Sequence, residues 1–492
     1  MNRYVLYILL LSPFFSLAQN RNSIWCFGDS AGIDFRNPGN PVPITSVVRS
    51  RSNCSSIADT GGNLLFYVAD DTTLSALGGR VYNRNHQQMP LGWGLITANW
   101  NHEMIIVPMP GNPDKYYIFH TSTSQIFGIY YSIIDMTMDN GFGDVAQANI
   151  CLTQESVLDG VAAVRHANGR DWWLIYAINQ TGTATHDNKF YMYLITPEGI
   201  SAPEILNIGD IFLTNLGDLS FSNDGSKMLF STITGLIEVF DFDRCSGIFS
   251  NATIVEPEYV SSRTIASSAL SPDKNLVYVS SNDYISYLYQ YDLRANPISS
   301  SRDTLCTFSN LHNVTGMLRL APDNKIYLSN IYYNFIINPF PYADSIYNTY
   351  NMNLSVINAP DSVGAACNFQ PYSFYLGGKR TYFGLPNNPN FELGPVQGSV
   401  CDSLISVQEI SSLHGNFSVF PNPFYNKISL HPFLPTNKKV ALEIENETGQ
   451  LVFNKIITFA DQEVDLSFLP QGIYFLRLTG NEFSEVKRLV RL

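Results

Sequence analysis

One phrase that recurs at intervals of 48 to 58 residues between Cys54 and Phe374 constrains the fold of this chain most strongly. Each copy has a strand-like run, a polar turn and an aromatic-rich run. The copies cover residues 55–71, 105–122, 162–179, 218–233, 268–282 and 318–330, with turn markers at Gly61, Gly111, Gly169, Gly225, Asp273 and Asp323. Gly, Asn and Asp accept the backbone angles of tight turns, so each copy predicts a β-hairpin.

A further strand follows most of these hairpins, as at residues 128–141, 189–199, 236–247 and 288–296. About four short strands per unit, repeated without a helix, are typical of a β-propeller; a solenoid is the alternative. Residues 23–35 and 368–386 could assemble one more unit from the two ends, which would leave no open sheet edge. We therefore predict a seven-bladed propeller over residues 22–386, with six or eight blades as alternatives.

Composition agrees with a mainly β protein. Charged residues make up 14% and aromatic residues 13% of the chain, and Gly and Pro are frequent. The net charge is −13, and because residues 417–492 hold equal numbers of acidic and basic side chains, the excess acid lies before them. An acidic surface repels phosphate backbones, so we expect no nucleic-acid partner.

The first 18 residues have the pattern of a secretory signal peptide: basic Arg3, an apolar run and a small-residue site ending at Ala18. We predict cleavage between Ala18 and Gln19. The alternative is an N-terminal anchor, but the apolar run is shorter than the ~20 residues that span a bilayer. Since no second long apolar segment follows, we expect no transmembrane segment in the mature chain.

The C-terminal residues 417–492 predict a small β-sandwich. Hydrophobic and polar residues alternate through residues 440–444 and 474–478, which is the period of a strand with one buried face. A hairpin turn is expected at residues 447–450, and six or seven strands make an Ig-like pair of sheets. Residues 387–416, rich in Asn, Ser, Gly and Pro, are expected to be a linker.

Two resemblances to known families extend this interpretation. Residues 25–28, 31–35, 63–67, 85–90, 116–119, 131–136, Cys367 and 384–386 resemble the propellers of secreted Bacteroidetes surface proteins, several tied to gliding motility. Residues 417–492 resemble the type A sorting domain of type IX secretion cargo, through Pro421, Asn422, Pro423, Thr448, Gly449, Val452, Leu469, Gly472, Ile473, Tyr474, Lys487 and Arg488. This second resemblance implies the type IX machinery as a partner and export through the periplasm to the outer-membrane surface or the medium. An ordinary Ig-like binding domain is the alternative.

The seven cysteines, at positions 26, 54, 151, 245, 306, 367 and 401, show no metal-binding spacing. Export permits disulfides, and the odd number leaves at least one thiol unpaired within the chain. One or two bridges, or buried unpaired thiols, are equally compatible with the sequence.

Two motifs resemble functional sites, but a structural role is favoured for each. Gly28, Ser30 and Gly32 fit the G-x-S-x-G pattern, but the prolines at 38, 41 and 43 exclude the helix that a hydrolase places next, so we expect Ser30 in a loop. Asp135, Asp139, Asn140 and Asp144 could hold Ca²⁺, although a solvated loop is favoured because no bidentate Glu follows.

Four histidines and four tryptophans are further candidate site residues. His86, His102, His120 and His166 fall at similar places in successive repeats, and inner strands could bring some of them to a central channel, but surface or hydrogen-bonded histidines are favoured. Trp93, Trp100, Trp172 and Trp173 could stack on sugars, although core packing is favoured.

The sequence shows no catalytic constellation, cofactor motif or metal site. We therefore expect a binding or interaction protein whose ligand is a surface protein or glycan. An exported hydrolase or lyase acting on polysaccharide or peptide, and a structural component of a surface or gliding assembly, are the alternatives.

Overall fold

The computed structural model describes residues 20–70, 77–98, 100, 102–123, 126–178, 187–212, 214, 216–257, 264–282, 285–309, 312–332, 342, 345–402, 417–422, 424–432, 439–446, 449–458, 460, 462–480 and 484–491. The chain forms two compact units, Met1–Ile405 and Ser406–Leu492. Strands make up the regular structure of the described residues, with three 3-10 turns, η1 (Asp139–Gly141), η2 (Ile298–Ser301) and η3 (Gly364–Cys367). The predicted cleavage site, Ala18 and Gln19, lies outside the described residues.

The described part of the first unit holds seven antiparallel sheets in chain order. The first contains β1 (Ile24–Phe27), β2 (Asp29–Asp34) and β3 (Val42–Arg49). The second contains β4 (Cys54–Ala58), β5 (Leu64–Asp70), β6 (Gly79–Asn83) and β7 (Gln88–Leu95). The third contains β8 (Met104–Pro108), β9 (Lys115–Ser122), β10 (Gly128–Asp135) and β11 (Asp144–Thr153). The fourth contains β12 (Val157–Arg165), β13 (Trp172–Ile178), β14 (Asp187–Thr196), β15 (Gly199–Ile200) and β16 (Glu204–Phe212).

The last three sheets repeat the four-stranded pattern. The fifth contains β17 (Gly217–Phe221), β18 (Lys227–Thr232), β19 (Ile237–Phe242) and β20 (Phe249–Glu256). The sixth contains β21 (Ile265–Leu270), β22 (Leu276–Ser281), β23 (Ser286–Asp292) and β24 (Asp303–Phe308). The seventh contains β25 (Asn313–Leu320), β26 (Ile326–Tyr332), β27 (Asn353–Ile357) and β28 (Phe369–Tyr375).

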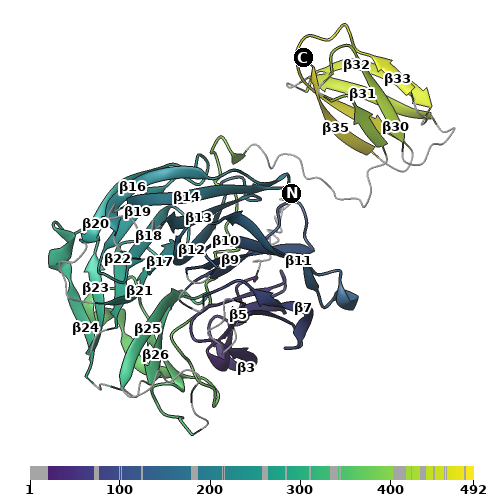
Figure 1. Ribbon diagram of the computed structural model, residues 1–492. Helices are drawn as coiled ribbons and strands as arrows, with labels where there is room; N and C mark the ends of the chain where they lie inside the picture. Colours follow the sequence, from purple (N-terminus) through teal and green to yellow (C-terminus); the bar gives the residue numbers. More distant parts are fainter. Residues whose placement is uncertain are drawn as a thin grey trace, which may run out of the picture. The chain divides into compact units, whose positions relative to one another are not determined.

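The seven sheets close into a ring, which is the arrangement of a β-propeller. The first strand of each sheet, from β4 through β8, β12, β17 and β21 to β25, contacts the first strand of the next sheet. Figure 1 shows the fourth strands, such as β20 and β24, at the periphery of the ring. The ring closes through a shared core, in which Trp25 and Phe35 of the first sheet pack edge-on against Tyr327 of the seventh.

The predicted repeats form the first two strands of six sheets. Their turns place Gly111, Gly169 and Gly225 at φ values of +74°, +73° and +73°, which glycine adopts without a steric penalty. In the two copies marked by Asp273 and Asp323, the next residue takes the left-handed conformation instead. These turn residues therefore form the same kind of hairpin in successive sheets of the ring.

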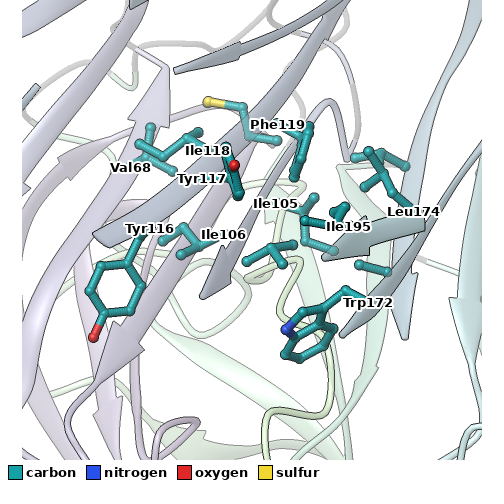
Figure 2. Packing of buried hydrophobic residues seen from close by; sticks show 14 of the residues in the cluster. Val68, Ile105, Ile106, Tyr116, Tyr117, Ile118, Phe119, Trp172, Leu174 and Ile195 are labelled. Atoms are coloured by element: carbon teal, nitrogen blue, oxygen red, sulfur yellow. The ribbon is translucent and has the colours of Figure 1, made fainter. Parts of the chain in front are cut away.

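Apolar side chains from neighbouring sheets fill the spaces between them. Figure 2 shows Ile105 of β8, Trp172 and Leu174 of β13, and Ile195 of β14 converging in one cluster. Trp172 and Leu174 are 1% and 0% exposed. Each sheet thus buries both faces, and a single sheet has no separate core.

Ring closure differs from the predicted joining of residues 23–35 with 368–386. Residues 369–375 form β28, which pairs with β27 as the fourth strand of the seventh sheet, while the first sheet has three strands. Arg380 bridges to Asp29 and Ser30 instead. Gly384 then passes so close to the chain that a Cβ would lie 1.7 Å from the Ser52 carbonyl oxygen. The C-terminal contribution to the first sheet is therefore a short extended segment rather than a full strand.

The second unit has two sheets around one apolar core. One contains β29 (Phe417–Phe420), β30 (Lys427–Pro432) and β33 (Gln462–Asp465), and the other contains β31 (Lys439–Asn446), β32 (Leu451–Thr458), β34 (Gly472–Thr479) and β35 (Ser484–Arg491). Ile428 and Leu430 of the first sheet lie in one cluster with Leu442 and Leu476 of the second. The predicted alternation therefore marks the buried face.

Candidate functional site

Two cavities lie at opposite ends of the inner strands, and we call them the first and the second mouth. At the first mouth, the starts of β17, β21 and β25 line a cavity of about 100 Å³ together with Arg51, Trp100 and Phe383. At the second mouth, the ends of β12, β17, β21 and β25 line a cavity of about 410 Å³. The second mouth is therefore the larger candidate binding site.

Three buried charged or polar side chains join different sheets between the mouths. His102 precedes β8, Asp218 lies in β17 and Arg319 lies in β25. One carboxylate oxygen of Asp218 lies 2.6 Å from His102 Nδ1 and 3.2 Å from Arg319 Nη2. The hydroxyl of Ser267, on β21, donates to the other oxygen at 2.7 Å. Asp218 thereby ties four sheets together at the axis.

Burial and neighbouring charges set the protonation of this trio. Burial opposes the charged carboxylate of Asp218, but Arg319 and His102 outweigh it and hold the Asp218 pKa well below its usual range. Burial, followed by the positive charge of Arg319, lowers the pKa of His102. The lowered pKa favours the neutral imidazole of His102, whose Nδ1 lies within hydrogen-bonding distance of Asp218 and of Arg319 Nη2.

A second buried group lies beside the trio. The Asn53 side-chain amide donates to Asp70 at 3.0 Å and to Glu103 at 3.3 Å. Glu103 also accepts the backbone N–H of Ala98 at 2.9 Å. Burial, with added repulsion from Asp70 and Asp159, raises the pKa of Glu103 well above its usual range. Because these carboxyl groups line neither cavity, the arrangement holds loops and strands in place.

Residues 387–402, which we call the crossing segment, pack against the propeller although the sequence predicted a linker from residue 387. The Asn387 side chain donates to the carbonyl oxygens of Met104 and Val161 at 3.2 and 2.9 Å. The Asn390 side chain donates to the Asn223 carbonyl oxygen at 2.6 Å. The segment therefore crosses the second mouth, from contacts with the third and fourth sheets to a contact with the fifth.

Further contacts hold the end of the crossing segment. Arg244 Nη2 donates to the Gly394 carbonyl oxygen at 2.7 Å, and the Val396 N–H donates to the Ala167 carbonyl oxygen at 2.8 Å. A disulfide joins Cys401 to Cys245, which follows β19 in the fifth sheet. The other cysteines, at 26, 54, 151, 306 and 367, are unpaired. Sequence spacing left the pairing open, since the two cysteines are 156 residues apart.

Ser30 lies in β2 and not in the loop that the sequence predicted. Its φ is +64°, at the point where Arg380 bridges to the strand. The next residues continue the strand and turn into β3. No helix follows Ser30 in the described residues 31–49, so the G-x-S-x-G match lacks the strand–turn–helix context of a nucleophile.

The four residues considered as possible Ca²⁺ ligands do not share one site in the structure. Asp135 lies 3.3 Å from the Lys115 ammonium and accepts the Thr137 hydroxyl, while Asp144 accepts the Leu91 N–H at 2.9 Å. Asp139 and Asn140 lie exposed in η1. Across the described part of the chain, no cluster of three or more His, Cys, Asp or Glu side chains could hold a metal ion.

Of the four candidate histidines, one lies at the axis of the ring and the other three make contacts elsewhere in the propeller. His102 belongs to the buried trio. His120 is buried between the Ile96 carbonyl and the Ser132 hydroxyl, and burial lowers its pKa to about 4. His86 contacts the Tyr67 hydroxyl at 3.0 Å, and His166 contacts the Cys245 carbonyl oxygen at 3.0 Å.

The four candidate tryptophans lie in different environments. Trp172 and Trp173 are 1% and 8% exposed and pack in the core. Trp93 is 61% exposed on the outer strand β7, away from both mouths. Trp100 lines the first mouth, where the Arg51 guanidinium lies 5.3 Å from its ring and 5.1 Å from that of Phe383. The indole face is therefore already engaged by a cation.

In the second unit, the described residues of the predicted sorting motif lie at several places around the two sheets. The Asn422 side chain donates to the Arg488 carbonyl oxygen at 2.7 Å and accepts the Val490 N–H at 2.9 Å. Tyr474 is buried, and its hydroxyl donates to the Pro470 carbonyl oxygen. Pro421 is exposed, Gly449 turns between β31 and β32, and Gly472 begins β34 beside β35, which holds Lys487 and Arg488. Pro423 lies outside the described residues.

Sequence reasoning missed the axial trio and the crossing segment. Asp218 and Arg319 are 101 residues apart, and no spacing rule links them. The available signal was that charged residues are rare in this chain, yet Asp218 and Arg319 stand within otherwise uncharged inner strands. Asn387 lies in an Asn-rich stretch that reads equally well as a linker.

Comparison with solved structures gives remote similarities. A candidate 6-phosphogluconolactonase from Bacteroides fragilis NCTC 9343 is 11% identical, with 75% of this chain and 98% of that chain covered and a TM-score of 0.45. The Dos1 propeller is 11% identical, with coverages of 74% and 86% and a TM-score of 0.39. The Cps50 (Swd1) β-propeller domain of Myceliophteria thermophila is 11% identical, with coverages of 64% and 97% and a TM-score of 0.35. Likenesses this remote carry no information on activity, and the ring of sheets supports the architecture independently.

Comparison by sequence identifies the second unit. A search of curated proteins found no match. In the described residues, no helix has the length and apolar character needed to cross a membrane. Residues 418–491 match the model of the secretion system C-terminal sorting domain. The chain therefore carries a type IX sorting domain behind a β-propeller, which implies export out of the cell.

Proposed function

We propose that this protein is a secreted or cell-surface β-propeller binding protein that the type IX machinery exports through its C-terminal domain. The cavity of about 410 Å³ at the second mouth carries the binding part of the proposal. Its volume lies within the roughly 300–1,000 Å³ of typical ligand sites. Strands of several sheets converge there, and such a rigid scaffold suits recognition of a surface protein or glycan.

The proposal includes the finer architecture. Each of the seven sheets is taken as one blade, the crossing segment belongs to the propeller, and the two sheets of the second unit form an Ig-like sandwich. The sequence resemblance supports an origin among Bacteroidetes surface proteins, including those of gliding assemblies. Retention at the surface and release into the medium are two outcomes of the same export route.

Catalysis is the less supported function. Glu103 and Asp70 share the amide of Asn53, and convergent carboxyl groups are the tools of hydrolases. Both side chains are buried, at 0% and 2% exposure, and neither lines a cavity. A substrate bound at either mouth would not reach them, so we propose binding without turnover.

The test is to probe the purified full-length mature protein against glycan and peptide arrays and against envelope fractions. Saturable binding that a bulky substitution at the second mouth abolishes would support the proposal. Turnover of a bound polysaccharide or peptide that Glu103→Gln abolishes would replace it with an enzyme. Concentration-dependent self-association without ligand binding would favour a structural component.

A further inference from the structure

Apolar and uncharged polar groups both line the cavity at the second mouth. Seven amide side chains contribute to the lining, at Asn20, Asn22, Asn223, Asn324, Asn387, Asn388 and Asn390. Among them, Asn388 donates to Asn22 and Asn390 donates to Asn223. Asn20 and Asn324 are exposed to solvent. Ser220 also lines the cavity and is half-buried on β17. An amide both donates and accepts hydrogen bonds, as does each hydroxyl of a sugar.

The two charged side chains among the described lining residues are both engaged within the protein. Arg319 donates to both carboxylate oxygens of Asp218 at 3.2 Å. Glu392 accepts the backbone N–H of Arg21 at 2.8 Å. An anionic ligand such as a phosphate binds best to an available Arg or Lys, which this lining does not present. The lining chemistry therefore favours a neutral ligand.

Apolar surface lies between the amides. Phe221 and Leu219 of β17 contribute to the wall, as does Leu393 of the crossing segment. A pyranose ring combines hydroxyl edges with an apolar face, and both kinds of surface are present here. A peptide backbone would match the amides as well, but an extended peptide needs a continuous groove, whereas this cavity is confined to one end of the channel.

The crossing segment forms one wall of this cavity, since residues 387–390, Glu392 and Leu393 all line it. Its end is fixed by the disulfide between Cys245 and Cys401 and by Arg244. Fixing a wall before binding reduces the ordering cost that the ligand must overcome. The disulfide between Cys245 and Cys401 therefore helps to hold this wall in place.

We propose that the second mouth is a binding site for a short neutral saccharide and that the disulfide between Cys245 and Cys401 holds one wall of this site in place. This inference rests on the proposed binding function and adds to it the ligand class and the role of the crossing segment. Binding is then tightest under the oxidising conditions that the exported protein meets outside the cytoplasm.

The experiment measures binding of the full-length mature protein by calorimetry. The probes are neutral hexasaccharides of glucose, xylose and N-acetylglucosamine, with glucose 6-phosphate and a neutral Gly-Asn-Ser peptide as contrasts. We expect at least one neutral saccharide to bind, and glucose 6-phosphate and the peptide to bind at least about tenfold more weakly. Ser220→Arg places a long side chain in the cavity and should weaken saccharide binding by about tenfold or more. Ser250→Arg, on the exposed face of β20, is the matched control and should bind normally.

The disulfide arm uses Cys401→Ser, with Cys151→Ser as the control because Cys151 is an exposed unpaired thiol. Cys401→Ser should weaken saccharide binding about twofold to tenfold, whereas Cys151→Ser should leave it unchanged. Thermal melting of every variant checks that the propeller is folded.

Three results would overturn the inference: no neutral saccharide binds, binding is unaffected by Ser220→Arg in a folded variant, or glucose 6-phosphate or the peptide binds more tightly. If array experiments still reveal a protein ligand at the second mouth, the proposed binding function survives and the saccharide inference alone fails. If nothing binds in either experiment, both fail.

Discussion

The propeller and the sorting domain are both built from antiparallel strands, but their interiors differ. The propeller buries charged groups at its axis, including Asp218 and Arg319. In the described part of the sorting domain the core is one apolar cluster, and the ion pair of Lys427 with Glu463 is exposed. Stacking two sheets needs only matching apolar faces. Arranging seven sheets around an axis leaves inner strand edges that need polar partners, and buried side chains supply them.

The largest difference between the two regions should appear in export. Deleting residues 417–492 removes the whole sorting domain but none of the contacts that close the ring. We expect a folded propeller that stays in the periplasm, with complete loss of the protein from the cell surface and the medium. Cell fractionation followed by limited proteolysis measures both location and folding. Arrival of the truncated protein in the medium would show that the propeller carries its own export signal.

The second prediction compares a buried with an exposed ion pair. Asp218→Ala leaves Arg319 without its carboxylate in the axis and should cost about 3–5 kcal/mol of unfolding free energy. Glu463→Ala removes the partner of Lys427 on the sorting domain surface and should change stability little, because water screens the pair. Urea denaturation of both variants measures the difference. Equal effects would mean that the axial trio contributes no more than a surface pair.

The third prediction concerns the disulfide, which belongs to the propeller alone. All seven cysteines precede residue 417, so reduction cannot act directly on the sorting domain. Loss of the bond between Cys245 and Cys401 should lower propeller stability by about 2–4 kcal/mol, since the bond closes a long loop. Denaturation with and without reductant should shift one transition and leave the other in place. A shift of both transitions would indicate that the two units unfold together.

The sequence predicted the parts of the fold that local chemistry determines. Turn residues such as Gly169 and Gly225 mark hairpins wherever they occur, and alternation around Leu442 marks a buried face. The contacts of Asp218, Arg319 and Asn387 could not be predicted from the sequence, because they depend on which strands the closed ring brings together. The crossing segment was missed for the same reason: Asn-rich composition is compatible with a free linker and with a chain whose amides bond to carbonyl groups.

The smallest expected effect distinguishes the two regions by pH. Burial raises the pKa of Glu103, so the folded propeller favours its protonated form. This contribution to stability is present below the unfolded pKa of about 4.3 and is lost as the pH rises toward the folded pKa. Glu103→Gln keeps the shape without the charge, so it should be about 1 kcal/mol or more stabilising at pH 8 and nearly neutral at pH 4.

The matched control for Glu103→Gln is Glu443→Gln on β31 of the sorting domain, where the side chain is only partly buried. Asp218 acts in the opposite direction, because its lowered pKa gives a contribution that is present above about pH 4 and lost as the pH falls. Urea denaturation at pH 4, 6 and 8 therefore separates the two groups. If Glu103→Gln is destabilising at every pH, the carboxylate is charged in the folded protein, and its bonds from Asn53 and Ala98 outweigh its burial.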